Sequence, residues 1–155
     1  MFDTTAGGDT TGNGWGRSVG MTSGMDYWVG AWADQSPTSF RQLWGYSGSW
    51  NMLNQNPVTV SGDTISFSFA LADLGLSMGS VFCFDAMSTG GGGNDSAWDL
   101  LSKSAVNDAA PFDGTTGWTE YTTSTNCLSY QVVPEPASMI ALATGVAALI
   151  RRKKK

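Results

Sequence analysis

The C-terminal end of the chain constrains its fold more than any other segment. Pro134, Glu135 and Pro136 are followed by an uncharged, mostly apolar run over residues 137–150. The two prolines hold the backbone extended, and the apolar run predicts a hydrophobic C-terminal helix. Because basic residues stay on the cytoplasmic side of a bilayer, a terminal cationic cluster predicts that the rest of the chain lies outside. That cluster consists of Arg151, Arg152, Lys153, Lys154 and Lys155.

The apolar run is short for a membrane helix. Its fourteen residues would span about 21 Å, against a hydrocarbon core of roughly 30 Å. Long arginine and lysine side chains can snorkel to the interface and cover part of this difference. An amphipathic or buried C-terminal helix is the alternative interpretation. The tripeptide on one flank and the cations on the other favour the membrane segment.

Residues 133–155 resemble the PEP-CTERM family of sorting signals, in which the tripeptide, a transmembrane helix and a terminal basic cluster occur together. The resemblance implies that an exosortase-type enzyme recognises Pro134, Glu135 and Pro136 and cuts near them. It also implies a precursor anchored in the inner membrane and a mature bacterial protein at the cell surface or in the extracellular matrix. We therefore divide the chain into an extracytoplasmic domain over residues 1–132 and a sorting and anchor segment over residues 133–155.

Residues 1–8 contain neither the basic n-region nor the apolar h-region of an export signal. Because the tail predicts export, we expect further sequence upstream, including at least one strand of the domain.

Charge and composition narrow the function classes. Residues 1–150 hold three basic side chains against thirteen acidic ones, a formal charge of −10. This argues against nucleic acid as a partner, because phosphate binding needs clustered lysine and arginine. The chain has no histidine, which excludes hydrolases of the Ser-His and Cys-His types. Binding without chemistry remains open, as does a glycosidase with paired carboxylates chosen from Asp26, Asp34, Asp85 and Glu120.

Short alternating segments predict an all-β domain. Residues 64–71 alternate Ile65, Phe67, Phe69 and Leu71 with small or polar residues, which predicts a strand with one buried face. One short helix is predicted over residues 96–102, opened by a Ser-x-x-Asp capping box. The turn spacing predicts an antiparallel β-sandwich or jelly roll. Further strands are predicted over residues 26–33, 42–46, 81–86, 119–122 and 128–133.

Residues 67–76, 81–85 and 90–99 together resemble a β-sandwich module of planctomycete-type surface proteins, many of which end in PEP-CTERM tails. The wider similarity, over residues 20–132, is to DOMON-like and carbohydrate-binding sandwiches. The resemblance implies the fold and assigns no activity.

Cys83 and Cys127 are the only cysteines. In an oxidising compartment they would form a disulfide worth on the order of 4 kcal/mol. Two unpaired buried thiols are the alternative.

The glycine-rich loop after residue 89 carries candidate metal ligands. Asp95 and Asp99, with Asp85 upstream, could supply carboxylate oxygens to Ca²⁺. The alternative assigns Asp95 and Asp99 to helix capping and the glycines to a tight turn. No other cofactor is indicated.

The seven tryptophans permit stacking against sugar rings. Trp28 and Trp44 are expected mainly in the core, because large aromatic side chains commonly fill sandwich interiors. Trp32 falls on the same face of its predicted strand as Trp28. Trp50 and Trp118 lie beside glycine or serine turns and are the candidate glycan-binding residues, with extracellular polysaccharide as the partner. A non-enzymatic structural or adhesive surface protein is the leading hypothesis, and a carbohydrate-binding module is the second.

Overall fold

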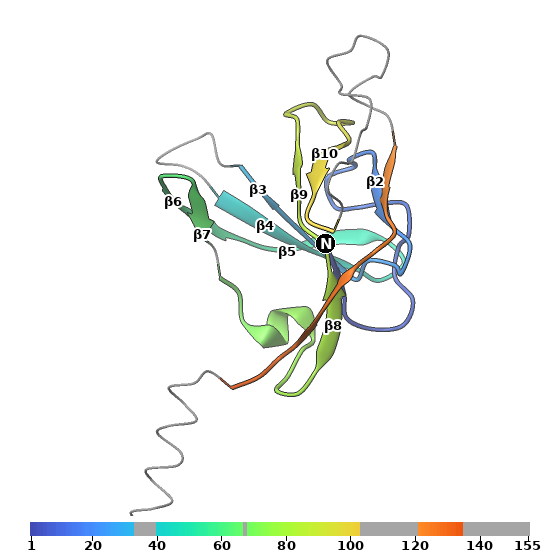
Figure 1. Cartoon of the computed structure of the whole chain (residues 1–155), viewed down its shortest axis with the longest axis vertical. Helices are drawn as coiled ribbons and strands as arrows, with labels where there is room; N and C mark the ends of the chain where they lie inside the picture. Colours follow the sequence, from blue (N-terminus) through green and yellow to red (C-terminus); the bar gives the residue numbers. More distant parts are fainter. Residues whose placement is uncertain (33–39, 67, 103–120, 135–155) are drawn as a thin grey trace, which may run out of the picture.

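The computed structural model describes residues 1–32, 40–66, 68–102 and 121–134 (Figure 1). Strands dominate these residues, and the one helical element among them is a single 3-10 turn, η1 (Leu71–Leu74). The all-β class is therefore confirmed. The sandwich or jelly-roll arrangement stays a prediction, and the expected C-terminal helix lies outside the described residues.

A six-stranded antiparallel sheet forms the centre of the molecule. Its strands run in the order β12-β8-β1-β3-β4-β5, so the short strand β1 lies between β8 and β3. Strands predicted over residues 26–33, 42–46, 81–86 and 128–133 correspond to four of the six. The bounds are β1 (Phe2–Asp3), β3 (Tyr27–Ala31), β4 (Phe40–Tyr46), β5 (Trp50–Pro57), β8 (Val81–Phe84) and β12 (Leu128–Gln131).

Three two-stranded ribbons accompany this sheet. β9 (Met87–Thr89) pairs antiparallel with β10 (Ala97–Leu100), and β6 (Thr59–Ser61) pairs antiparallel with β7 (Thr64–Ser66). β2 (Val19–Met21) pairs with β11 (Thr122–Ser124) and is the parallel exception among the described strands. β11 starts at the last residue of the strand predicted over 119–122.

Apolar side chains cover both faces of the main sheet. Successive residues of a strand point to opposite faces, and Trp28 and Val29 of β3 accordingly belong to different clusters. We call them the Trp28 cluster and the Leu43 cluster. The buried members of the Trp28 cluster are Met1, Val19, Met21, Met25, Trp28, Ala97 and Leu100, and those of the Leu43 cluster are Leu43, Leu74, Leu76 and Val132.

The strand predicted over residues 64–71 is wrong in length and burial. Strand pairing ends at Ser66, and the chain enters η1 at Leu71. Ile65 is 45% exposed, because β6 and β7 form a ribbon of their own instead of joining the main sheet. The alternating pattern correctly indicates a strand at residues 64–66, but every residue of β7 and of its partner β6 is exposed.

The helix predicted over residues 96–102 is also wrong. Residues 97–100 form β10, which pairs with β9 and buries Ala97 and Leu100. The carboxylate of Asp95 accepts a hydrogen bond from the backbone N–H of Gly92 and so closes the glycine-rich turn. Cross-strand pairing thus overrides the local capping signal.

Candidate functional site

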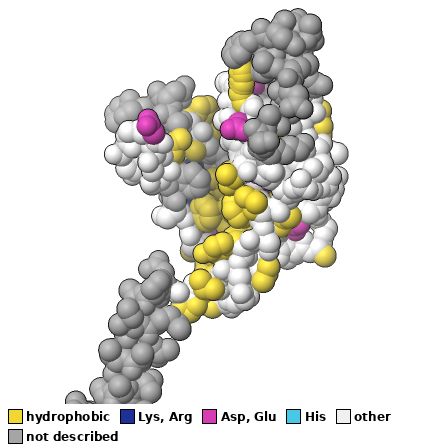
Figure 2. Space-filling model, in the orientation of Figure 1, with side chains coloured by type: hydrophobic (Ala, Val, Ile, Leu, Met, Phe, Trp, Pro, Cys, Tyr) yellow, Lys and Arg dark blue, Asp and Glu magenta, His cyan; other side chains and the backbone are white. Residues whose placement is uncertain are grey.

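A groove of about 760 Å³ opens between β3 and β9. Its walls are residues 29–32 on one side and 86–91 on the other, with Met1 between them. Figure 2 shows hydrophobic side chains gathered in the hollow around the N-terminus marked in Figure 1. We call this feature the central groove. Its volume lies in the range typical of ligand sites.

Three tryptophans form one side of the central groove. The Trp15 ring is tilted by 37° against the Trp32 ring, with centroids 3.9 Å apart, and its centroid lies 6.5 Å from that of Trp28. The indole N–H of Trp15 donates to Gln42 Oε1 at 2.7 Å, which fixes the ring. Trp28 is 2% exposed, so its predicted core position is confirmed, and its indole nitrogen has no hydrogen-bond partner.

Arg17 is a buried cation that lines the same groove. It is 7% exposed, and its Nε and Nη1 atoms have no hydrogen-bond partner. The side chain of Asn13 holds the Arg17 backbone, accepting from its N–H at 3.0 Å and donating to its carbonyl at 2.8 Å. The guanidinium lies over the Trp15 ring at 5.5 Å. Burial of unpartnered guanidinium donors is costly, so this position favours an anionic partner.

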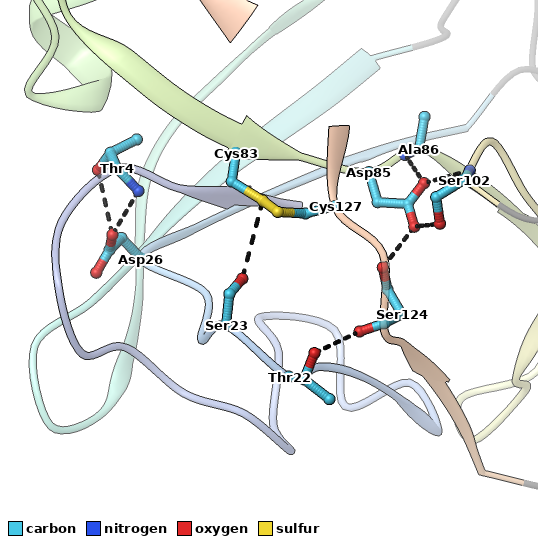
Figure 3. Close-up of a disulfide and its surroundings, with 10 residues drawn as sticks. All are labelled: Thr4, Thr22, Ser23, Asp26, Cys83, Asp85, Ala86, Ser102, Ser124 and Cys127. Atoms are coloured by element: carbon cyan, nitrogen blue, oxygen red, sulfur yellow. Dashed lines mark hydrogen bonds between the residues drawn. A yellow bond between two sulfur atoms is a disulfide. The ribbon is translucent and has the colours of Figure 1, made fainter. Parts of the chain in front are cut away.

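Asp85 is buried, lines the central groove, and has hydrogen-bond partners on both carboxylate oxygens (Figure 3). Its carboxylate accepts hydrogen bonds from the Ser102 and Ser124 hydroxyls, both at 2.6 Å, and from the backbone N–H groups of Ala86 and Ser102. Its carbonyl accepts from the α-amino group of Met1 at 3.0 Å. Burial lowers the pKa of that amino group to about 5, opposed by the charge of Asp85.

The proposed calcium ligands do not assemble. Among residues 1–32, 40–66, 68–102 and 121–134, no group of three or more acidic or cysteine side chains is placed to hold a metal ion. Asp85 points into its serine partners, and Asp95 bonds within its own turn. Asp99 lies in β10 and is exposed. The geometry favours the turn interpretation of the glycines, without the helix capping that accompanied it.

The two cysteines form a disulfide (Figure 3). Cys83 of β8 and Cys127, just before β12, lie 5.5 Å apart at their Cα atoms, and 44 residues separate them in the chain. The bond ties the strand that ends the domain to the sheet interior. Of the two alternatives for these residues, the structure therefore adopts the paired one.

Trp50 is half-buried and its polar edge is already used. Its indole N–H donates to Asp9 Oδ2 at 3.0 Å, and its ring lies 5.4 Å from that of Tyr46. Burial alone would raise the pKa of Asp9, but hydrogen bonds from the Gly12 and Thr11 backbone and from Trp50 hold that pKa below its ordinary value. Trp118 lies outside the described residues.

The carboxylates considered for glycosidase chemistry do not form a described pair. Asp26 Oδ2 accepts hydrogen bonds from the backbone N–H groups of Thr4 and Thr5, each at 2.7 Å. Asp85 is saturated as described above. Asp34 and Glu120 lie outside the described residues.

Val132 is the last residue of the described range 121–134 with backbone hydrogen bonds to the rest of the domain. Its N–H donates to Ser80, its carbonyl accepts from Gly79, and its side chain is buried in the Leu43 cluster. Val133 and Pro134 are exposed immediately afterwards. Glu135, Pro136 and the basic cluster over residues 151–155 lie outside the described residues. Within the described part of the chain, no helix has the length and apolar character needed to cross a membrane.

The central groove was not anticipated from the sequence. Its lining residues come from six separate segments of the chain, around Met1, Trp15, Trp28, Ile65, Met87 and Tyr130. One signal was available: Arg17 is one of only three basic residues before the terminal cluster, and it stands two positions after a tryptophan.

Comparison with protein families finds the PEP-CTERM protein-sorting motif over residues 132–155. The match begins at Val132, the residue that follows the end of β12. Such a motif indicates an exported protein that is anchored in the membrane before an exosortase-type enzyme processes it. No curated protein and no solved structure matched the chain.

Proposed function

We propose that residues 1–132 belong to the mature part of a non-enzymatic bacterial surface protein with a structural or adhesive role. The segment after them directs sorting and is removed by cleavage near Pro134, Glu135 and Pro136. The observation that carries this proposal is the sorting motif, which starts at Val132, the last described residue with backbone hydrogen bonds to the domain. The mature protein then remains at the cell surface or in the extracellular matrix.

The junction suits a processing enzyme. Proteases bind extended and accessible backbone, and exposed segments outside hydrogen-bonded structure are preferred cleavage sites. Val132 is fixed by backbone hydrogen bonds, whereas Val133 is 56% exposed. A cut beyond this point removes the anchor without opening the sheet.

The disulfide supports an extracytoplasmic destination. Disulfides persist in oxidising compartments and are rare in a reducing cytosol. The Cys83–Cys127 bond holds β8 next to β12, the strand that leads into the sorting segment.

The processing proposal is tested by expressing the chain behind an export signal in a bacterium that has an exosortase. We expect surface protein whose peptides, by mass spectrometry, stop short of Ile150. Replacing Pro134, Glu135 and Pro136 with alanine should trap the uncut precursor in the inner membrane. The matched control, Asp95→Ala in the glycine-rich turn, should leave sorting unchanged. Mature surface protein that still ends in Lys155 would overturn the assignment.

Polysaccharide binding is the second candidate, favoured by the Tyr46–Trp50 pair. These rings flank the exposed turn over residues 47–49, and Asp9 fixes the orientation of Trp50. Retention on insoluble cellulose and on cross-linked alginate measures this activity. Trp50→Ala should abolish retention, whereas Leu53→Ala, an exposed control on the same strand, should not. Equal retention of both variants would remove the candidate.

A further inference from the structure

The sorting segment leaves the domain beside the turn that precedes β8. The Val132 N–H donates to the Ser80 carbonyl at 2.8 Å, and the Gly79 N–H donates to the Val132 carbonyl at 2.9 Å. These two bonds hold the turn and the exit of the tail side by side at one end of the main sheet (Figure 1). We call the turn and the exit together the tail-proximal end, which consists of residues 77–81 and 131–133. Met1 lies at the other end of β8, where it bonds to Asp85.

Apolar side chains are exposed at the tail-proximal end. Met78 is 54% exposed, Val81 is 60% exposed and Val133 is 56% exposed. Hydrophobic side chains are visible in the lower part of the domain in Figure 2, where the turn before β8 lies in Figure 1. Exposed apolar groups that gather in one place indicate an interaction surface, whereas singly scattered ones do not.

The two segments that form this end carry no charge. Residues 1–150 have a formal charge of −10, yet neither residues 74–84 nor residues 121–134 contain a charged side chain. The acids that flank the first of these stretches are Asp73, which lies in η1, and Asp85, which is buried. Repulsion from an anionic lipid surface acts mainly on the charges nearest to it. An acidic domain therefore meets such a surface at the lowest electrostatic cost with its uncharged end.

The tail limits how far this end can lie from a membrane. Residues 133–136 separate Val132 from the apolar run over residues 137–150. Fully extended backbone from Val132 to residue 137 reaches about 18 Å, of which the headgroup layer takes up about 5–8 Å. As a helix, the apolar run is shorter than the hydrocarbon core is thick, and such a mismatch draws flanking residues toward the interface. The tail-proximal end is therefore tethered beside the headgroups.

The opposite edge of the main sheet provides a comparison. β5 is also uncharged, and its Met52 and Leu53 are 50% and 52% exposed. It lies at the far end of the strand order from β12, five strand spacings or roughly 24 Å away. Apolar side chains are thus equally exposed at two edges of the sheet, and the tether brings one of these edges to the membrane.

We propose that the tail-proximal end rests on the lipid bilayer while the tail anchors the precursor, with Met78 and Val133 inserted into the headgroup layer. The inference rests on the anchored precursor and not on where the processing enzyme cuts. These few side chains bury less apolar surface than one acyl chain, which by itself binds a bilayer only marginally. The contact therefore lasts only while the tail holds the domain at the membrane.

The test uses the whole chain with photo-methionine in place of methionine, reconstituted into vesicles of phosphatidylethanolamine with a minority of phosphatidylglycerol. On illumination, each photo-methionine reacts with the molecule that it contacts, and mass spectrometry locates the lipid adducts. Met139 belongs to the apolar run and reports insertion of the tail. We expect adducts on Met139 and Met78, and severalfold fewer on Met52, which has nearly the same exposure as Met78.

A charge placed at each edge separates a specific contact from chance labelling. Val81→Asp should lower the yield of Met78 adducts about fivefold, because a negative charge at this end is repelled by the anionic lipid. Leu53→Asp, at a similarly exposed position on β5, should leave that yield unchanged. Near-ultraviolet circular dichroism verifies that both variants fold. Equal adducts on Met78 and Met52 with Met139 labelled, or a Met78 yield that Val81→Asp does not change, would overturn the contact and leave the anchoring in place. Absence of adducts on Met139 would overturn the anchored precursor and this inference with it.

Discussion

The main sheet has a closed half and an open half, and a buried arginine marks each. In the closed half, β3, β4 and β5 pair along their lengths. Arg41 is 2% exposed there, with Asn54 and Ser68 bound to its two terminal nitrogens and its Nε alone without a partner. In the open half, β3 faces β9 across the central groove, and Arg17 is 7% exposed with two unpartnered nitrogen atoms. The same residue type at similar burial is therefore hydrogen-bonded to its neighbours through both terminal nitrogens in one place and carries two unpartnered donors in the other.

The largest effect on stability is expected from removing the disulfide that joins Cys83 of β8 to Cys127 before β12. Cys83→Ser with Cys127→Ser should lower the free energy of unfolding by about 4 kcal/mol, because the bond closes a long loop in the unfolded chain. Urea denaturation measures the loss. Ser23→Ala removes only the hydroxyl beside Cys83 and serves as the control. A loss of unfolding free energy below about 1 kcal/mol would show that the stability of the domain does not depend on this disulfide.

The second effect is a pH dependence of stability that comes from the Met1 amino group, which donates to the Asp85 carbonyl beside the groove. When the polypeptide is produced starting at Met1, the Met1 amino group has a pKa of about 5 in the folded chain, against an ordinary 8.0. Between these values the unfolded chain takes up a proton that the folded chain does not. Stability should therefore fall as the pH is lowered from 8 to 5, by up to about 4 kcal/mol. Below pH 5 this contribution stops changing, because both states are protonated.

The chain has no histidine, so this pH window is free of imidazole titration. Thermal unfolding at intervals from pH 8 to pH 5 measures the slope, and acetylation of the Met1 amino group should remove it. A flat profile in the unmodified chain would contradict the buried position of this group.

The two arginines give the direct comparison. Arg41→Met should cost about 3 kcal/mol, because the substitution leaves acceptors on Asn54 and Ser68 without their donor. Arg17→Met should change stability by less than about 1 kcal/mol or raise it, since no described hydrogen bond to its Nε or Nη1 is lost. Urea denaturation measures both losses of unfolding free energy. Equal losses for Arg41→Met and Arg17→Met would show that the two arginines do not differ in how they stabilise the fold.

Prediction from sequence succeeded where the signal was local and independent of tertiary partners. The tail from Pro134 onward is a linear motif, and it was identified without any knowledge of the fold. Strands such as β3 and β8 were located because their apolar or aromatic character reflects burial in the main sheet.

The failures have one physical origin. Residues 96–102 carry a local helix signal, but β9 offers backbone partners that outweigh it. The central groove depends on which segments lie side by side, and nothing near Trp15 in the sequence specifies that Met87 lies across from it. The site residues therefore required the sheet order, whereas the sorting motif did not.

The smallest effect is expected at Ile65, where sequence and structure disagree most directly. A buried face over residues 64–71 would make Ile65→Thr cost well over 1 kcal/mol, as large core truncations do. The side chain is 45% exposed on the β6–β7 ribbon, so the substitution should change the free energy of unfolding by less than about 0.5 kcal/mol. Leu43→Ala, at a fully buried position in β4, provides the contrast and should cost about 3 kcal/mol. Ile65 also lines the central groove. A loss at Ile65 comparable to that at Leu43 would mean that the ribbon packs onto the sheet in solution and that the groove is narrower than the structure has it.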